Sequence, residues 1–351
     1  MKTKIVKIDS NNIDTSLLTE AAGILKNGGL VAFPTETVYG LGADGLNEEA
    51  AKKIYAAKGR PSDNPLIVHI ADFHGLEELT RECPDKGRKL AEAFWPGPLT
   101  LIFKKSSKVP LSTTGGLDTV AIRMPSHLIA YELIRTSGIY IAAPSANVSG
   151  RPSPTKAEHV IEDLDGKIDM IIDGGKVNIG LESTIVDVTS KIPVILRPGY
   201  ITVDMIEKVI GRVDIDKAVF SGIQDANIRP KAPGMKYKHY APKGDLTIYE
   251  GSSENVVKAI NKITEEKLLL GYRVGIIATE ETFPYYKKGN VKTIGTRKDE
   301  NTIARGLFEV LRDFDSEGTD YIFTESFDNN HLGQAIMNRL LKAAGYHIEK
   351  V

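Results

Sequence analysis

Residues 58–69 carry the side chains in this chain that are best suited to bind a phosphate. Their sequence is KGRPSDNPLIVH, in which Lys58 and Arg60 stand on a segment stiffened by Pro61 and Pro65. Proline fixes its own φ and disfavours helix at the residue before it, so the two cations are held together on a non-helical hook. Phosphate matches both the planar donor fork of Arg and the compact charge of Lys. A solvated basic loop is the alternative, but the prolines and the apolar strand that follows favour an anion site.

The composition excludes several classes of protein. The chain has 351 residues, a net charge of −1 and one cysteine, Cys83. This length accommodates two domains, and the near-neutral charge gives no overall field for nucleic acid. A single cysteine excludes internal disulfides and a thiolate zinc cluster, and it fits a reducing cytosol. No apolar run approaches the ~20 residues that span a bilayer, and the first residues alternate like a strand. We expect a soluble, cytoplasmic protein that contacts no membrane.

The apolar pattern predicts a large α/β sheet in the first 211 residues. Buried strands are expected at residues 30–33, 66–70, 99–103, 119–123, 139–142, 170–172, 184–188 and 194–196. Helices are expected at residues 15–27, 48–57, 86–94, 126–136, 155–163 and 203–210. Ser126 and Thr155 stand where helix caps are expected, and Glu158 follows Thr155 at capping-box spacing. Because strands and helices interleave, we expect an open sheet of mixed direction.

The pattern changes after residue 211. Residues 232–242 read APGMKYKHYAP, which is too aromatic and too constrained for an ordinary linker, so we expect this segment to dock against the protein. A second α/β domain follows, with strands at 246–249, 274–278, 291–295 and 321–324 and helices at 253–267, 300–312 and 333–344. That order predicts a parallel sheet. The second domain has no phosphate-loop signature, so we expect it to have a supporting or partner-binding role rather than to carry the chemistry.

Polar turns adjoin the predicted strands of the first domain, at residues 34–42, 112–119, 144–153, 181–184 and 196–199. Loops at strand ends form the usual ligand crevice of an open α/β sheet, and small hydroxyls and glycines let backbone N–H groups approach a phosphate. The glycines at 40, 42 and 45 match a dinucleotide fingerprint, but they do not directly follow a strand. The acid expected to bind ribose should end a second strand about 20 residues on, whereas Asp63 lies in the hook. His69 is either a core histidine or a ligand contact, and no zinc-ligand spacing is present.

Together these segments resemble the threonylcarbamoyl-adenylate synthase family with the YrdC-like fold, in its long two-domain form. The resemblance rests on PTETVYGL at 34–41, KGRPSDNPL at 58–66, WPGPLT at 95–100, RMP at 123–125, PSAN at 144–147, EST at 182–184, RPG at 197–199 and APGMKYKHY at 232–240. It covers nearly the whole chain, and no expected binding position departs from the pattern. WPGP at 95–98 is expected to be structural.

The resemblance implies a catalytic domain at 1–211, with an open twisted mixed sheet and helices around a concave cavity. It also implies a linker at 212–244 that closes over the active site, and a Rossmann-like C-terminal domain at 245–351. The implied enzyme is an ATP-dependent nucleotidyltransferase that forms threonylcarbamoyl-AMP and pyrophosphate from L-threonine, bicarbonate and ATP with magnesium. Its product would pass to a separate transferase complex that makes threonylcarbamoyladenosine in tRNA, and direct tRNA binding is left open.

The resemblance also implies a role for each matching position. The residues expected to bind ATP are Lys58, Arg60, Asn64, Thr119, Ser145, Asn147, Ser153, Arg197 and Tyr237. Those expected to bind L-threonine are Thr35, His69, Arg123 and Ser183, and Lys58, Arg60 and Arg123 are expected to act in catalysis by positioning and charge neutralisation. Tyr237, Lys238 and His239 would exclude water. Magnesium would be held largely by triphosphate and water, and whether Glu36 or Glu182 acts as a base stays open.

Two other functions remain as alternatives. A non-catalytic RNA-binding module would show salt-dependent affinity for RNA and no ATP turnover, but the chain lacks a basic stripe with interleaved aromatics. A carbamoyl transferase that uses preformed carbamoyl phosphate would release no pyrophosphate in response to threonine and bicarbonate.

Overall fold

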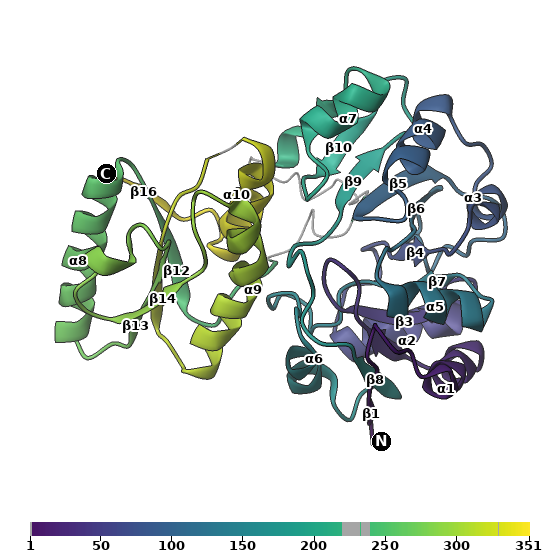
Figure 1. Ribbon diagram of the computed structural model, residues 1–351, viewed down its shortest axis with the longest axis horizontal. Helices are drawn as coiled ribbons and strands as arrows, with labels where there is room; N and C mark the ends of the chain where they lie inside the picture. The colour runs from purple at the N-terminus through teal and green to yellow at the C-terminus, as the bar shows by residue number, and fades with distance from the viewer. Residues whose placement is uncertain (1, 220–231, 233–238, 329) are drawn as a thin grey trace. The chain divides into compact units, whose positions relative to one another are not determined.

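The computed structural model describes residues 2–219, 232, 239–328 and 330–351 (Figure 1). Its contacts divide the chain into two compact units. The N-terminal unit comprises Met1–Ser149, Ser153–Asn178 and Glu182–Lys236, and the C-terminal unit comprises Gly150–Pro152, Ile179–Leu181 and Tyr237–Val351.

The N-terminal unit is built on one large mixed sheet. Its strands are β1 (Lys4–Lys7), β2 (Val31–Phe33), β3 (Gly40–Asp44), β4 (Ile67–His69), β5 (Leu99–Lys104), β6 (Thr119–Arg123), β7 (Ile141–Ala142), β8 (Met170–Asp173), β9 (Thr184–Asp187), β10 (Val194–Arg197) and β11 (Asp214–Ile215). The described residues place them in the order β1-β8-β2-β3-β7-β4-β6-β5-β9-β10-β11. β4 and β6 run parallel, whereas β5 runs antiparallel to β6 and β7 runs antiparallel to β4, so the predicted mixed direction is confirmed.

Helices pack on this sheet and bury its apolar side chains. They are α1 (Thr15–Lys26), α2 (Glu48–Lys58), α3 (Phe73–Leu79), α4 (Asp85–Phe94), α5 (Leu128–Ser137), α6 (Ala157–Leu164) and α7 (Val203–Ile210), followed by the short helix η1 (Lys217–Val219). Separate core clusters form around Leu101, Leu41 and Leu25. Trp95 belongs to the first cluster and donates from Nε1 to the carbonyl of Leu99 at 2.7 Å, as expected for a structural corner.

Three details of the sequence prediction were wrong. The segment that contains Gly40 and Gly42 is strand β3, not part of a loop. Helix α5 is capped by His127 and α6 by Lys156, neither through a side-chain hydrogen bond, so Ser126 and Thr155 are not their caps. The cap motif is short and common, and both helices begin two residues later than predicted, at Leu128 and Ala157.

The C-terminal unit has a parallel sheet of its own, as predicted. Its strands are β12 (Asp245–Glu250), β13 (Val274–Ala278), β14 (Asn290–Thr293), β15 (Tyr321–Glu325) and β16 (Ile348–Lys350), in the order β14-β13-β15-β12-β16. Helices α8 (Ser253–Leu269), α9 (Glu300–Ser316) and α10 (His331–Ala343) and the short helix η2 (Phe283–Tyr285) connect them. Strand β16 was not foreseen, because it has only three residues and two of them are exposed.

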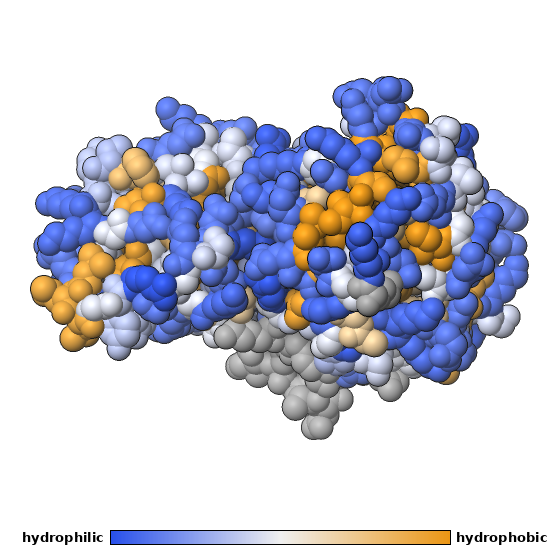
Figure 2. Space-filling view, turned by 90° about the horizontal axis from the view of Figure 1, so that it is seen from below, coloured by the Kyte–Doolittle hydropathy of each residue, from blue (hydrophilic) through white to orange (hydrophobic). Residues whose placement is uncertain are grey.

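The surface is mostly hydrophilic in the view of Figure 2, and apolar residues are exposed there in separate patches. Exposed apolar residues are normal on a folded protein, since polar atoms alone cannot cover it. Among the described residues, no helix is long and apolar enough to cross a membrane.

The fingerprint-like glycines of β3 are explained by packing. A Cβ atom on Gly42 would lie 2.7 Å from Cε1 of Phe33 and 2.8 Å from Cγ2 of Ile141, both in the core. We therefore predict that Gly42→Ala lowers the free energy of unfolding by about 1–3 kcal/mol, measured by urea denaturation. The matched control is Gly40→Ala, whose Cβ would find its nearest neighbour at 3.4 Å, an ordinary contact. Equal stability of the two variants would contradict this explanation.

Candidate active site

Helix α2 delivers Lys58 to the hook. The helix ends at Gly59, which adopts the left-handed conformation with φ 60°, and Lys58 is only 2% exposed. Its Nζ donates to the carbonyl oxygens of Ser145 and Asn147, and the Ser145 hydroxyl donates to the Asn147 side chain. The loop at 144–153 is therefore joined to the hook, and three of the residues predicted to bind ATP lie together.

Arg60 and Asn64 are buried on the hook itself. Arg60 Nη2 donates to the carbonyl oxygens of Asn64 at 3.4 Å and Pro65 at 3.2 Å. The N–H of Leu66 donates to the carbonyl of Thr113 at 2.9 Å, which ties the hook to the turn at 112–119. Oδ1 of Asn64 is buried and accepts no hydrogen bond from the described residues. Such an acceptor carries a desolvation cost that a ligand's donor group would remove.

Neighbouring strands bring residues from distant parts of the sequence onto one face of the sheet. His69 at the end of β4 pairs with Arg123 at the end of β6, and Arg123 also pairs with Thr100 of β5. Side chains alternate along a strand, so Thr119 and Arg123 share this face but lie ~13 Å apart, at opposite ends of β6. Thr119 therefore lies away from the residues predicted to bind threonine.

Arg123 is the centre of a buried polar cluster. Its Nη2 lies 2.7 Å from Oε1 of Glu36 in an ion pair, and its Nη1 donates to the Thr37 hydroxyl at 2.9 Å. The Thr37 and Thr35 hydroxyls are hydrogen-bonded at 2.8 Å. Burial opposes ionisation of Glu36, but the charge of Arg123 holds the pKa of this carboxyl below its ordinary value. Nε of Arg123 is also buried and donates no hydrogen bond to the described residues, so one donor of the guanidinium is available to a ligand.

A second set of contacts joins Arg197 to this cluster. Arg197 Nε donates to the carbonyl of Ser183 at 3.0 Å, and its Nη2 donates to the Ser183 hydroxyl at 3.2 Å. That hydroxyl lies 2.7 Å from the hydroxyl of Thr100, the residue paired with Arg123. All four residues predicted to bind threonine therefore lie in one connected group: Thr35, His69, Arg123 and Ser183.

Two of the residues predicted to bind ATP remain, Ser153 and Tyr237. The Ser153 hydroxyl donates to Oε1 of Glu182, which joins the loop at 144–153 to the turn at 181–184. Tyr237 lies outside the described residues. Thr37 and Thr100 also belong to the cluster around Arg123 and were not predicted, although each left a signal in the sequence. Thr37 repeats the hydroxyl of Thr35 two residues later, and Thr100 places a hydroxyl inside an otherwise apolar strand.

One residue of the segment at 232–242 is buried against the large sheet. Ala232 is fully buried in a small apolar cluster with Ile67, Ile102, Ala121, Ile185 and Leu196. The registers of β4, β5 and β6 put Ile67, Ile102 and Ala121 on the face that carries Thr119 and Arg123. Within the C-terminal unit, the rings of His239 and Tyr240 meet at 4.2 Å, and Tyr240 packs on Phe308 at 5.0 Å.

The family of the chain follows from two family models and its relatives. A model described as "Telomere recombination" matches residues 23–199, and one described as "Threonylcarbamoyl-AMP synthase, C-terminal domain" matches residues 201–345. The threonylcarbamoyl-AMP synthase of Bacillus subtilis (strain 168) is 52% identical over 349 residues, which cover 98% of this chain and 99% of the relative. This chain belongs to the threonylcarbamoyl-AMP synthase family.

Other members of the threonylcarbamoyl-AMP synthase family show the same agreement. The enzyme of that name from Pyrococcus abyssi (strain GE5 / Orsay) is 52% identical over 331 residues, which cover 94% of this chain and 95% of the relative. The crystal structure of P. abyssi Sua5 complexed with L-threonine has a TM-score of 0.94 and 49% identity, and it covers 99% of this chain and 100% of its own. The long, two-unit form recognised in the sequence is therefore confirmed.

The environment of His69 predicts that its imidazole has a pKa well below the ordinary value. Burial and the nearby charge of Arg123 lower the pKa of His69 from 6.5 to about 3, although Glu36 acts in the opposite direction. We predict that its imidazole NMR signals stay unchanged from pH 8 to pH 5. The unfolded chain takes up this proton near pH 6.5, so His69 stabilises the fold above that pH, and the contribution is lost as the pH falls from 6.5 towards 3.

Loss of one histidine signal in a His69→Gln variant assigns the resonance. The same variant should flatten the decline in stability between pH 6.5 and pH 4, since it removes one group that binds a proton only in the unfolded state. A titration midpoint between pH 6 and pH 7 would contradict the predicted shift.

Proposed function

We propose that this chain is an L-threonylcarbamoyladenylate synthase, which forms threonylcarbamoyl-AMP and pyrophosphate from L-threonine, bicarbonate and ATP. Family membership over nearly the whole chain supports this assignment. The structural observation that carries it is the connected group around Arg123, in which residues expected to bind threonine meet buried cations suited to phosphate.

The proposed threonine subsite lies at the ends of β4 and β6. Arg123 would bind the amino-acid carboxylate through a guanidinium that Glu36 and Thr37 already hold in place. The threonine hydroxyl would meet the hydroxyls of Thr35 or Ser183, and the neutral His69 imidazole would offer a nitrogen without adding charge. The threonine amine then attacks bicarbonate carbon, and loss of water leaves a carbamate.

The proposed ATP subsite extends from the hook along the same sheet face towards Thr119. A carbamate oxygen attacks the α-phosphorus, and the bond to the bridging oxygen of pyrophosphate breaks. Lys58, Arg60 and Arg197 would neutralise charge on the phosphates, which is the main contribution a protein makes to transfer at phosphorus. Magnesium would arrive with the triphosphate and be held largely by phosphate oxygens and water, a common arrangement for this ion.

Further parts of the proposal concern location and partners. We propose that the enzyme acts in the cytoplasm and that its product passes to a separate tRNA-modifying transferase complex. The expected boundaries at 211/212 and 244/245 stay predictions, as does the choice between Glu36, Glu182 and no protein group as general base. The ion pair of Glu36 with Arg123 favours a positioning role for that residue.

Pyrophosphate release tests the assignment. We predict that release requires ATP, threonine and bicarbonate together, and that Lys58→Ala or Arg123→Ala lowers the rate by at least ~10²-fold, the scale of losing one transition-state charge contact. The matched controls are Lys52→Ala, on the exposed face of α2, and Arg135→Ala, in an exposed pair with Glu132. Both controls should keep wild-type rates.

The outcomes separate the alternatives. If carbamoyl phosphate can replace bicarbonate and ATP in the assay, the result would indicate a carbamoyl transferase. Salt-dependent RNA binding without turnover would indicate an RNA-binding module. Wild-type rates in Lys58→Ala and Arg123→Ala would remove those residues from the site, provided that circular dichroism shows both variants folded.

We also propose that the segment at 212–244 shields the labile product from water. Burial of Ala232 beside the sheet face of the site supports this role. A Tyr237→Ala, Lys238→Ala double variant leaves Ala232 and the packed Tyr240 intact. We predict that it consumes ATP at a near-normal rate but yields several-fold less threonylcarbamoyl-AMP per pyrophosphate, measured by chromatography of the quenched reaction. An unchanged ratio of the two products would contradict the shielding role.

A further inference from the structure

The carboxyl edge of the C-terminal sheet has the topology of a ligand crevice. From β13 the chain continues to β14 on one side, whereas from the neighbouring β15 it continues through α10 to β16 on the other side. Ligands of open α/β sheets bind where adjacent strands diverge in this way, beyond their carboxyl ends. Nothing in the sequence pattern of this unit marked a site there.

Two adjoining cavities open at this edge. The larger, of about 490 Å³, is lined mainly by polar groups from the ends of β12 and β15 and the start of α8, including Ser252, Glu325 and Asp328. The smaller, of about 340 Å³, is lined in part by Val257, Tyr285 and Thr282. Ser253 and Arg297 border both cavities. The larger cavity is thus mainly polar and the smaller one mainly apolar, so together they fit a ligand with a polar head and an apolar side group.

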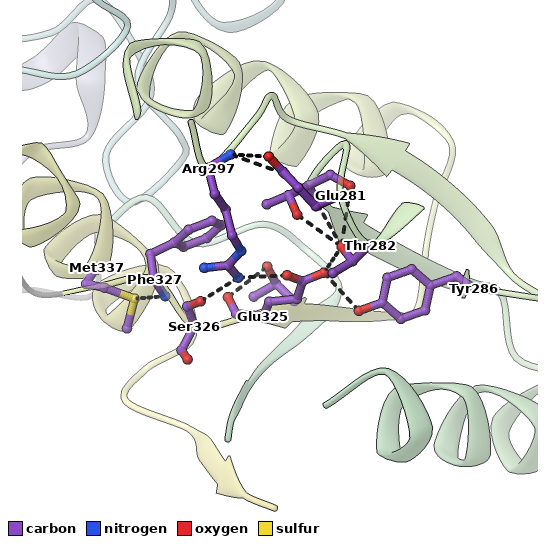
Figure 3. A network of polar contacts seen from close by, with 10 residues as sticks. Glu281, Thr282, Tyr286, Arg297, Glu325, Ser326, Phe327 and Met337 are labelled. Carbon is purple, nitrogen blue, oxygen red and sulfur yellow. Dashed lines mark hydrogen bonds and ion pairs between the residues drawn. The ribbon is translucent and has the colours of Figure 1, made fainter. Parts of the chain in front are cut away.

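Arg297 is held in place between the cavities (Figure 3). Its Nη2 donates to Oε2 of Glu325 at 2.7 Å and to the carbonyl of Ser326 at 2.9 Å, and its backbone N–H donates to Glu281. Glu325 also accepts hydrogen bonds from the hydroxyls of Thr282 and Tyr286. Nε and Nη1 of Arg297 donate to no described residue, so the oriented guanidinium keeps donors for a ligand carboxylate.

The other charged side chains that line the cavities favour a ligand that also carries a cationic group. Carboxylates at five positions line the two cavities: Glu250, Glu254, Glu281, Glu325 and Asp328. Arg297 pairs with Glu325 and Lys350 with Glu250 at 3.5 Å, so the carboxylates of the lining outnumber the cations beside them. Burial opposes ionisation of Glu281, but the Thr296 hydroxyl and the Arg297 N–H lower its pKa to about 2. Repulsion by this acidic lining disfavours a multiply charged anion such as a nucleotide. An ammonium group, in contrast, is attracted to it.

We propose that the C-terminal unit binds a free α-amino acid with an apolar side chain in these adjoining cavities. Its carboxylate pairs with Arg297 beside the N-terminus of α8, whose dipole also favours an anion. Its ammonium group lies among the carboxylates of the larger cavity, and its side chain enters the smaller cavity against Val257 and Tyr285. This site is separate from the threonine subsite proposed for the N-terminal unit.

Calorimetry on the full chain tests the proposal, with L-leucine and L-phenylalanine as probes. We expect saturable binding of at least one of them. Its amide, which lacks the carboxylate, and its deaminated acid, which lacks the ammonium group, should each bind at least ~10-fold more weakly, because each loses a charge-assisted contact. Absence of saturable binding by both amino acids overturns the proposal, as does tighter binding of adenosine or spermidine.

Variants locate the binding. Val257→Trp should fill the smaller cavity and Asp328→Asn should remove one carboxylate of the larger cavity, so each should weaken binding several-fold, whereas Lys258→Ala, on the exposed side of α8, should not. Asp328 is exposed, so its substitution tests the site even where Val257→Trp fails to fold. Arg123→Ala should leave binding unchanged. Loss of binding in Arg123→Ala would assign the amino acid to the N-terminal unit and overturn this inference without affecting the proposed reaction.

Discussion

The burial of positive charge is the constraint on which the N-terminal unit depends. Lys58, Arg60, Arg123 and Arg197 are each at most 7% exposed. A buried charge is tolerated only where oriented polar groups replace its water. Backbone carbonyls replace much of this water around Lys58, Arg60 and Arg197, and they belong to the loop at 144–153, the hook and the turn at 181–184. Glu36 has the same role for Arg123. The loops must therefore fold around the cations, so the protein itself holds these side chains in place.

The Arg123–Glu36 pair shows how this arrangement orders a side chain. A guanidinium fixed by a carboxylate and a hydroxyl would lose little freedom on binding a ligand carboxylate, so less of the binding free energy would be spent on ordering it. The same logic recurs at Arg297 in the C-terminal unit, where Glu325 and the Ser326 carbonyl hold the guanidinium. The two sites differ in charge. Cations dominate the first and carboxylates the second, so a triphosphate suits the first and an ammonium group the second.

The two sheets also place their sites differently. In the mixed sheet, antiparallel neighbours bring Arg123 and Thr100 face to face, so side chains on the sheet surface take part in the site. In the parallel sheet, the strand interiors are buried, as in β13, and the available groups lie at the carboxyl edge. The glycines of β3 belong to the packing of the mixed sheet, where Gly42 has no room for a side chain. Steric packing therefore explains the glycine pattern that resembles a dinucleotide fingerprint.

The sequence by itself determined the family, the alternation of strands and helices, and the residue types of the proposed site, because apolar periodicity and short motifs are local properties of the chain. Only the tertiary structure decided which of them touch. Arg123 meets Thr37 across 86 residues and Ser183 meets Thr100 across 83, through strand registers that no local pattern encodes. Thr119 and Arg123 lie on one strand yet ~13 Å apart, because an extended chain separates its own residues while pairing distant ones. The cavities beside Arg297 likewise exist only because the ends of β12 and β15 and the start of α8 meet at one edge of the sheet.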